Sequence, residues 1–424
     1  MNKFQSLRGF NDVLPADAPA WRHLLRTADE VFAAYGYAEV RLPLLEQTEL
    51  FKRSIGEATD VVEKEMFSFQ DREGDSLTLR PEATASLVRL GLEHGLLHNQ
   101  QQRLWTWGPM FRHERPQAGR YRQFHQLDIE AYGLAGPDID VELIAVSARL
   151  FRTLGLSGLT LELNSLGGPD TRAAYRAALV AFLEKHEAHL DADSQRRLRS
   201  NPLRVLDSKV PATQAVVKDA PVITEHLDAE SRVHFEGMQK GLFDLGIAFT
   251  VNPRIVRGLD YYTRGVFEWT TTQLGAQGTV CAGGRYDGLV EQLGGTPTPA
   301  VGWALGVERL LMLMKAQNAP VPGYSPQVYV CSLGEAAERE AARRIEILRD
   351  ALPALRLILN AGGGKLPVQL KRADRSGATL ALILGEAEAA KGVIQVKSLR
   401  ENTPQTECAW PELPARLSAL LSPN

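Results

Sequence analysis

The stretch from Phe111 to Tyr132, FRHERPQAGRYRQFHQLDIEAY, decides the fold. It predicts two strands joined by a basic loop from Arg115 to Arg120. Because strand side chains alternate between faces, the second arm has a polar face with Arg122, Phe124, Gln126, Asp128 and Glu130, and an opposite face with His125, Leu127, Ile129 and Ala131. An exposed hairpin would also show this alternation. The mixture of a guanidinium, a ring and carboxylates favours the wall of a cleft for a charged, planar ligand.

Length, composition and charge indicate a globular protein with an ample core. The chain has 424 residues, which suggests about three domains at roughly 150 residues each. A net charge of -3 provides no global attraction to nucleic acid, so such contacts must be local. The three cysteines, Cys281, Cys331 and Cys408, form no CxxC pair, which argues against a disulfide framework or zinc site and for a reducing cytosol. With no apolar leader or spanning segment, we expect a cytoplasmic protein without membrane contact.

The segments before the decisive stretch predict a helix and several short strands. Residues 18–35 carry an apolar stripe at helical spacing, and a strand at 37–42 ends at Pro43. A hairpin is expected from 67–70 and 77–79. Pro81 then suits the first position of a helix, and Glu82 its positive end. Glu82 therefore has two compatible roles, capping a helix and receiving a ligand ammonium group.

The segments after it alternate between strands and helices. A helix is expected over 138–153 and a strand over 159–163, followed by a charged helical insertion over 173–246 and a strand over 247–251. The stretches VRGLDYYTRGVFEW (256–269) and VCAGGRYDGL (280–289) predict further strands, and the strand 301–305 leads into a helix that carries Arg309. A linker rich in Pro and Gly precedes strands at 328–332, 355–360, 380–384 and 393–398, with helices at 335–351 and 367–376.

This pattern predicts an α+β catalytic domain on an antiparallel sheet, with a helical insertion, and a C-terminal α/β domain. The expected boundaries are 1–320 for the first domain, with the insertion at 173–246, then 321–326 for the linker and 327–424 for the second domain. The sequence Gly362-Gly363-Gly364-Lys365 in that second domain is no P-loop, because leucines occupy the positions of its first glycine and its Ser/Thr.

The candidate cleft residues indicate nucleotide chemistry. They are Glu82, Arg112, Glu114, Phe124, Gln126, Glu130, Arg257, Tyr261, Tyr262 and Arg309. Several arginines without a nucleophile–base pair or a zinc set argue against triad hydrolysis and suit phosphoryl or nucleotidyl transfer, which needs positioning and charge stabilisation. The ring of Phe124 can stack on a base. The residues alone therefore predict a nucleotide-dependent enzyme.

Three motifs carry a resemblance to the class II aminoacyl-tRNA synthetases. The first is the helix and strand ending at Pro43, the second is Phe111-Arg112-His113-Glu114 followed by Arg120-x-x-x-Phe124, and the third is Gly302 to Arg309. Two further segments, RGLDYYTRGVFEW and AGGRYDGL, resemble signatures of the histidyl-tRNA synthetase family. The resemblance covers essentially the whole chain, with one departure at Ala83, where relatives often have glycine.

The resemblance implies roles for individual residues. The catalytic set would be Arg112, Arg257 and Arg309, with Arg112 and Arg257 on the α-phosphate of ATP. The ATP site would consist of Arg112, Glu114, Arg120, Arg122, Phe124 and Arg309. The histidine pocket would consist of Glu82, Ala83, Thr84, Arg112, Gln126, Glu130, Arg257, Tyr261 and Tyr262. Arg115 and Gln117 would face the acceptor end of a tRNA, and no protein ligand for a metal is implied.

The implied activity is that of a histidine–tRNA ligase, which forms histidyl-adenylate and pyrophosphate from L-histidine and ATP with Mg²⁺. Histidine would then pass to the 3′-hydroxyl of the terminal adenosine of tRNA-His, with the insertion holding the acceptor arm and the C-terminal domain binding the anticodon region. The resemblance also implies a homodimer. Two alternatives are a non-catalytic regulatory subunit of ATP phosphoribosyltransferase, which shares the fold, and a class II synthetase for another amino acid.

Overall fold

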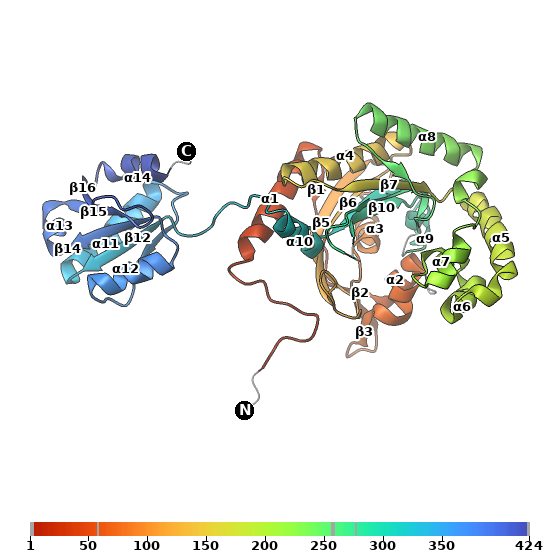
Figure 1. Cartoon of the computed structure of the whole chain (residues 1–424), viewed down its shortest axis with the longest axis horizontal. Coiled ribbons are helices and arrows are strands. Elements are labelled where there is room, and N and C mark those ends of the chain that lie inside the picture. Colours follow the sequence, from red (N-terminus) through yellow and green to blue (C-terminus); the bar gives the residue numbers. More distant parts are fainter. Residues whose placement is uncertain (1–3, 57–58, 256–258, 276–277, 422–424) are drawn as a thin grey trace. The chain divides into compact units, whose positions relative to one another are not determined.

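The computed structural model describes residues 4–56, 59–255, 259–275 and 278–421. The chain forms two compact units, Met1–Val321 and Pro322–Asn424. Figure 1 shows the first unit built on a large sheet with helices on both faces, and the second with a smaller sheet of its own. No helix among the described residues combines the length and the apolarity that crossing a membrane requires.

The sheet of the first unit has eight strands in the order β1-β5-β6-β11-β10-β9-β7-β8. Its bounds are β1 Ala38–Glu39, β5 Gln102–Phe111, β6 Gln123–Tyr132, β11 Ala300–Gly306, β10 Thr279–Arg285, β9 Thr263–Thr270, β7 Thr160–Ser165 and β8 Thr250–Val251. The six inner strands pair antiparallel, and only the two short edge strands pair parallel to their neighbours. The predicted α+β class on an antiparallel sheet is confirmed.

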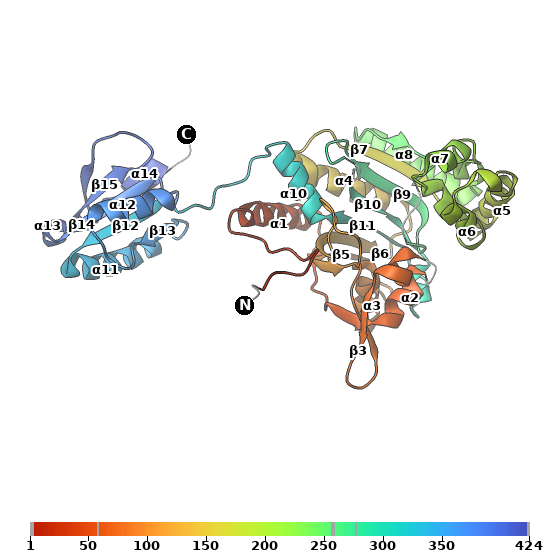
Figure 2. The same ribbon diagram turned by 60° about the horizontal axis from the view of Figure 1, so that its bottom comes forward.

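Helices cover the two faces of this sheet unequally. One face packs against α1 (Ala18–Ala34), α4 (Pro137–Thr153), α8 (Ala229–Asp244) and α10 (Val307–Ala316), and the apolar face of β6 joins the core there. The other face carries α3 (Thr84–Glu93) and α9 (Leu289–Gln292). Figure 2 shows α1, α4 and α10 on one side of β5 and β6, and α2 and α3 on the other. The polar face of β6 therefore points away from the main core, as the alternation predicts.

A three-stranded sheet in the order β2-β4-β3 supports the start of α3. It comprises β2 (Leu45–Gln47), β3 (Phe67–Gln70) and β4 (Ser76–Leu79), so the predicted hairpin is confirmed, and it is flanked by α2 (Thr48–Ile55) and a π-helical turn (Val61–Glu65). The prediction that Pro81 opens a helix is wrong. The helix begins at Thr84, because the Glu82 carboxylate accepts the backbone N–H groups of Thr84 and Ala85 and so fixes the first turn there.

Several predicted strands are shorter than expected. The strand at 37–42 contributes only two residues, since its one partner is the start of β5. The first arm of the decisive stretch ends at Phe111, because the N–H of His113 donates to the Glu65 carbonyl instead of to β6. The strand over 247–251 forms only at Thr250–Val251, and the one over 256–269 begins at Thr263 because Asp260 and Tyr261 lie in a turn.

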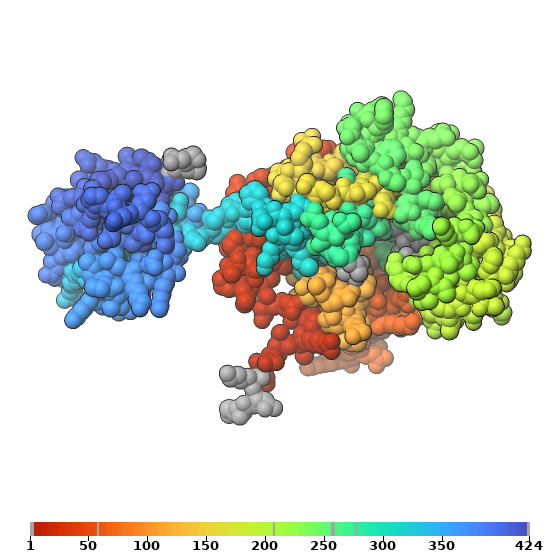
Figure 3. All heavy atoms as spheres, in the orientation of Figure 1, coloured from red at the N-terminus to blue at the C-terminus, as the bar shows by residue number. Residues whose placement is uncertain are grey.

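The residues between β7 and β8 fold into helices with a core of their own. They form α5 (Pro169–Lys185), α6 (Ala192–Ser200), α7 (Pro211–Val217) and three short helical turns, Glu187–His189, Pro202–Asp207 and Ile223–His226, and they end with α8, which packs against the main core. Tyr175, Leu179 and Leu198 are buried in this core. In the space-filling view, the segment from α5 to α7 forms one lobe of the first unit, in yellow-green (Figure 3).

The second unit contains a five-stranded sheet in the order β13-β12-β14-β15-β16. Its elements are β12 (Val328–Leu333), α11 (Glu335–Ala351), β13 (Leu357–Leu359), α12 (Leu366–Arg375), β14 (Leu380–Gly385), α13 (Glu386–Lys391), β15 (Val393–Ser398), β16 (Thr406–Ala409) and α14 (Leu413–Leu421). The predicted strands and helices are present, and α13, β16 and α14 are additional. α13 and β16 were missed because they are too short to show a clear period.

Candidate functional site

A cavity of about 360 Å³ lies over the polar face of the main sheet. Its walls come from β6, β10, β11, the start of α3, the loop after β5 and the turn before β9. Residues that the sequence predicts for one site meet here, namely Glu82, Thr84, Arg112, Glu114, Arg120, Phe124, Gln126, Tyr261, Tyr262 and Arg309. They come from segments up to 227 residues apart, Glu82 to Arg309, so the fold itself assembles the site.

Arg112 is held in place at one side of this cavity. Its Nε donates to the Pro81 carbonyl at 2.9 Å, and its guanidinium carbon lies 5.3 Å from the centre of the Phe124 ring. Nearby, Arg120 forms an ion pair with the Glu114 carboxylate. A fixed guanidinium beside an aromatic face suits a ligand that carries both a phosphate and a base.

Arg309 approaches the same end from the first turn of α10. Its Nε donates to the Gly119 carbonyl at 3.1 Å, and its Nη1 donates to the Thr279 carbonyl at 2.9 Å. Burial, and then the nearby Arg120 guanidinium, lower the pKa of Arg309. The Glu308 carboxylate anchors this helix to β6 by accepting the backbone N–H of His125. Three guanidinium groups therefore converge at this end, which favours an anionic ligand.

Buried carboxylates dominate the other end of the cavity. Glu82 caps α3 through the N–H groups of Thr84 at 2.8 Å and Ala85 at 3.0 Å, and the Tyr261 hydroxyl lies 3.5 Å from it. Glu130 lies behind Thr84, which lines the cavity. The Glu130 carboxylate accepts hydrogen bonds from the hydroxyls of Thr84 at 2.8 Å and Tyr286 at 2.5 Å.

The absence of a side chain at Gly302 leaves space for the Glu130 carboxylate. A Cβ built on Gly302 would lie only 1.4 Å from a Glu130 carboxylate oxygen. Residue 302 pairs with residue 130 across β11 and β6, so the carboxylate lies over the neighbouring strand. The first glycine of the third motif is therefore required by a close approach to the binding site.

The carboxyl groups of Glu82, Asp128 and Glu130 all have raised pKa values. Burial is the main cause for each, and the Glu82 charge adds to it for Asp128. For Glu130 the hydrogen bonds from Tyr286 and Thr84 oppose the rise. Three buried acidic groups close together favour a ligand that brings positive charge or N–H donors.

These pKa shifts predict how the ligand-free protein responds to pH. A carboxyl group with a raised pKa binds its proton more tightly in the folded chain than in the unfolded chain. Stability therefore falls as pH rises from about 4, the ordinary carboxyl pKa, through the raised values, and levels off above them. We expect the wild-type melting temperature to show this decline and Asp128→Asn to reduce it in thermal scans from about pH 4 to 8. Identical slopes for the two proteins would contradict the buried-carboxyl explanation.

Other residues predicted for the site lie outside the cavity lining. The Nε of Arg122 donates to the Glu114 carbonyl at 3.3 Å, and Ala83 is buried at the start of α3. Arg115 and Gln117 belong to the loop between β5 and β6, in which Gln117 exchanges backbone hydrogen bonds with Arg120. Arg257 lies outside the described residues. The roles of all five remain predictions.

The structure also adds residues that the sequence did not single out. Tyr286 donates a hydrogen bond to Glu130 and lies within the segment AGGRYDGL, for which the sequence predicted only a strand and a family signature. Glu268 and Arg204 line the cavity, Arg204 from the helical lobe. For Tyr286 the signal was its place in a recognised signature, whereas a charged residue within a helical run gives no signal of its own.

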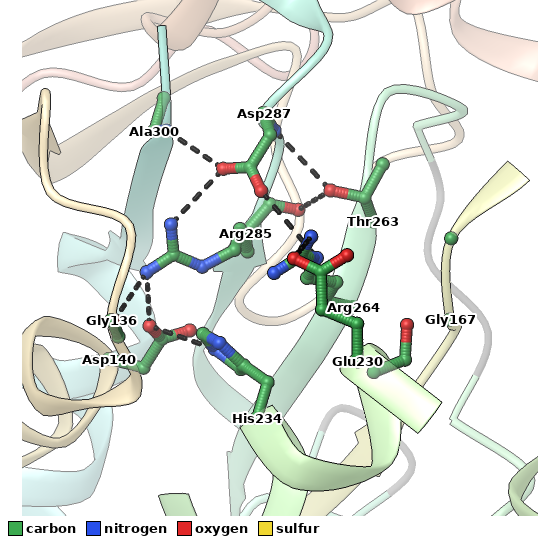
Figure 4. A network of polar contacts seen from close by, with 12 residues as sticks. Gly136, Asp140, Gly167, Glu230, His234, Thr263, Arg264, Arg285, Asp287 and Ala300 are labelled. Atoms are coloured by element: carbon green, nitrogen blue, oxygen red, sulfur yellow. Dashed lines mark hydrogen bonds and ion pairs between the residues drawn. The ribbon is translucent and has the colours of Figure 1, made fainter. Parts of the chain in front are cut away.

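A buried ionic network supports the segment that carries Tyr286 (Figure 4). Arg285 is fully buried, forms an ion pair with Asp140 of α4 and another with Asp287 at 3.1 Å, and donates to the carbonyl of Gly136 at 2.9 Å. His234 of α8 lies 3.3 Å from the same Asp140 carboxylate. The network thus joins β10 to α4 and to the helical lobe.

This sheet with its two arginine-bearing motifs defines a class II aminoacyl-tRNA synthetase fold. The chain belongs to the histidyl-tRNA synthetase family, whose family model matches residues 9–310, and an anticodon-binding domain model matches residues 327–420. The ligand-free histidyl-tRNA synthetase of Staphylococcus aureus is 33% identical with a TM-score of 0.82, over 98% of this chain and 100% of that one.

Two more distant structures share the fold. A histidyl-tRNA synthetase from a Nostoc species is 22% identical with a TM-score of 0.72, over 99% of this chain and 100% of that one. A Bacillus halodurans protein, described as an ATP phosphoribosyltransferase regulatory subunit/histidyl-tRNA synthetase, is 21% identical with a TM-score of 0.66, over 91% and 99% of the two chains.

Proposed function

We propose that this protein is a histidine–tRNA ligase. It activates L-histidine with ATP to form histidyl-adenylate and pyrophosphate, and then transfers histidine to the 3′-hydroxyl of the terminal adenosine of tRNA-His. The observation that carries the proposal is the composition of one cavity, where the arginine end adjoins a buried end lined by Glu82, Thr84 and Tyr261, with Glu130 bonded to Thr84 behind that lining. Family membership supports the same activity.

The arginine end suits ATP. Phe124 offers an aromatic face on which adenine can stack, a contact worth about 1–3 kcal/mol. Glu114, Arg112 and Arg309 line this cavity; Glu114 would accept a hydrogen bond from the adenine amino group, and Arg112 and Arg309 would bind phosphates. Mg²⁺ would neutralise the phosphates of ATP, mostly through phosphate and water oxygens. From the sequence, Arg257 is expected as a further arginine on the α-phosphate.

The chemistry then needs positioning more than covalent help. A carboxylate oxygen of histidine attacks the α-phosphorus, the bond to the bridging oxygen breaks, and pyrophosphate leaves with its electron pair. Arg112 stabilises the negative charge that spreads over the α-phosphate oxygens. The ribose hydroxyl of the tRNA next attacks the activated carbonyl, loses its proton, and releases AMP.

The rest of the chain suits a tRNA partner. We propose that Arg115 and Gln117 contact the acceptor end, that the helical insertion at 173–246 holds the acceptor arm, and that the domain at 327–424 binds the anticodon region. The anticodon-binding model supports the last of these roles. Family membership also supports a cytoplasmic homodimer.

The second candidate function is the regulatory subunit of ATP phosphoribosyltransferase, since a protein with that description shares the fold. The presence of Arg112, Phe124 and Arg309 in one cavity favours the ligase, because a non-catalytic subunit does not require a complete nucleotide site. Pyrophosphate exchange with each of the twenty amino acids, followed by charging of tRNA-His, tests the choice. Histidine-dependent exchange and charging support the ligase. Exchange with a different amino acid, or with none, overturns it.

Glu130→Ala should disable recognition of histidine while leaving ATP binding intact. The variant removes the partner of Tyr286 and Thr84 and the acidic group expected to meet the imidazole. A charge-assisted hydrogen bond contributes about 1.5–3 kcal/mol, so kcat/KM for histidine should fall at least about tenfold to a hundredfold. Kinetics of pyrophosphate exchange at varied histidine and varied ATP measure the two effects. An unchanged KM and rate for histidine would refute the assignment.

A further inference from the structure

Asp128 has no hydrogen-bond partner among the residues that the structure describes, although it is almost completely buried. It lies on the cavity face of β6 between Gln126 and Glu130, with 1% of its surface exposed, and it forms part of the cavity wall. Neither carboxylate oxygen accepts a hydrogen bond from any described residue. An unpaired buried carboxylate is costly, so its place in the wall of a binding cavity indicates that a ligand supplies the missing donors.

The two guanidinium groups whose charges act on Asp128, Arg80 and Arg112, are engaged elsewhere. Arg80 donates to the carbonyl oxygens of Pro109 at 3.0 Å and Leu42 at 3.2 Å, and Arg112 donates to a carbonyl beside α3. Both charges act on Asp128 from a distance, and among the described residues neither forms an ion pair with it. The Glu82 charge acts in the opposite direction. The described residues therefore compensate the charge of the Asp128 carboxylate only in part.

The number of unpaired acceptors matches an ammonium group. Besides both oxygens of Asp128, the side-chain oxygen of Gln126 is buried and accepts no hydrogen bond from the described part of the chain. An ammonium group offers three N–H donors, whereas an imidazole offers at most two. Glu130, the next residue on this face, already accepts one hydroxyl on each oxygen. The acceptor atoms that a ligand would have to supply with donors are therefore those of Gln126 and Asp128.

The order of residues along β6 agrees with this assignment. Successive residues on one face of a strand are about 7 Å apart. Phe124, at the nucleotide end, is followed by Gln126, Asp128 and then Glu130, which is the proposed partner of the imidazole. In histidyl-adenylate the ammonium group lies between the adenosine phosphate and the imidazole. Asp128 occupies the matching intermediate position.

We propose that the Asp128 carboxylate joins Gln126, which the resemblance already assigns to the histidine pocket, in binding the α-ammonium group of the amino-acid substrate. This inference rests on the proposed function and deepens it. Asp128 thereby selects an amino acid over an acid of the same shape that lacks the amine, and the substrate's positive charge offsets the buried acidic cluster.

Calorimetric titration of the full chain with two ligands tests this role. The ligands are L-histidine and imidazolepropionate, which differ only in the ammonium group. Asp128→Asn, nearly the same size as the native residue, should raise the Kd of histidine roughly 10- to 100-fold. The same variant should change the Kd of imidazolepropionate less than about threefold. Equal losses for both ligands, or no loss for histidine, would overturn the proposal.

A matched control is Thr106→Val, because Thr106 lies directly opposite Asp128 on β5, is fully buried and does not line the cavity. It should leave both affinities unchanged. Asp128→Ser provides a second variant if the Asn variant does not fold, and the same ligand-dependent difference is expected. If the wild type binds no histidine, the ligase proposal itself fails. If the wild type binds histidine and Asp128→Asn binds it equally well, only the role of Asp128 fails.

Discussion

Replacing Arg112 by alanine should lower the rate of histidine-dependent pyrophosphate exchange by about 10³-fold. Three arginines line this end of the cavity. Among them, Arg112 lies beside the Phe124 ring, and its Nε donates to the backbone carbonyl of Pro81. In the proposed reaction it contacts the α-phosphate, where negative charge shifts in the transition state. The loss should therefore appear mainly in kcat, measured at saturating ATP and histidine.

Arg112→Lys separates charge from geometry. Lysine keeps the positive charge but lacks the planar fork that binds two oxygens at once, so the exchange rate should recover only in part. Arg72→Ala is a suitable control, because Arg72 is exposed in the turn between β3 and β4. Melting temperatures of the variants check that the fold is intact. A folded Arg112→Ala protein with a near-normal single-turnover rate would refute the catalytic role.

The sequence predicted the residues that line the cavity better than the contacts that hold these residues in place. Period-2 alternation correctly separated Phe124, Gln126 and Asp128 from the apolar face of β6, because that strand is regular and central in the sheet. The strand prediction was wrong for residues 112–114, where the chain leaves the sheet to bond Glu65, although Arg112 and Glu114 still line the cavity. A strand that ends through a tertiary hydrogen bond carries no local sign of its end.

The prediction for the start of α3 shows a related limit. Pro81 suits a first helical position by its fixed φ, yet the carboxylate of Glu82 determines where the helix begins. Tyr286 was missed for a different reason. Its role depends on a hydrogen bond to Glu130, 156 residues away in sequence, and only the pairing of β10, β11 and β6 brings the two together.

Arg285→Met should cause the largest loss of stability among these variants, about 3–5 kcal/mol. Methionine fills similar space but leaves Asp140, which is 2% exposed, without its strongest partner and the carbonyl of Gly136 without its donor. Urea unfolding followed by tryptophan fluorescence reports on the first unit, because five of the six tryptophans lie in it and Trp410 is the exception. A clear fall in the midpoint is expected.

The exposed ion pair Arg26–Glu30 provides a control for the stability loss expected from Arg285→Met. Both side chains are mostly exposed, so Arg26→Met should change stability by less than about 1 kcal/mol. Adding Asp140→Leu to Arg285→Met should recover part of the loss, since an apolar pair removes the unpaired charge. If Arg285→Met were no more harmful than Arg26→Met, the network would not support the sheet. Because Tyr286 follows Arg285 directly, a real loss of support should also weaken histidine binding in the variant that still folds.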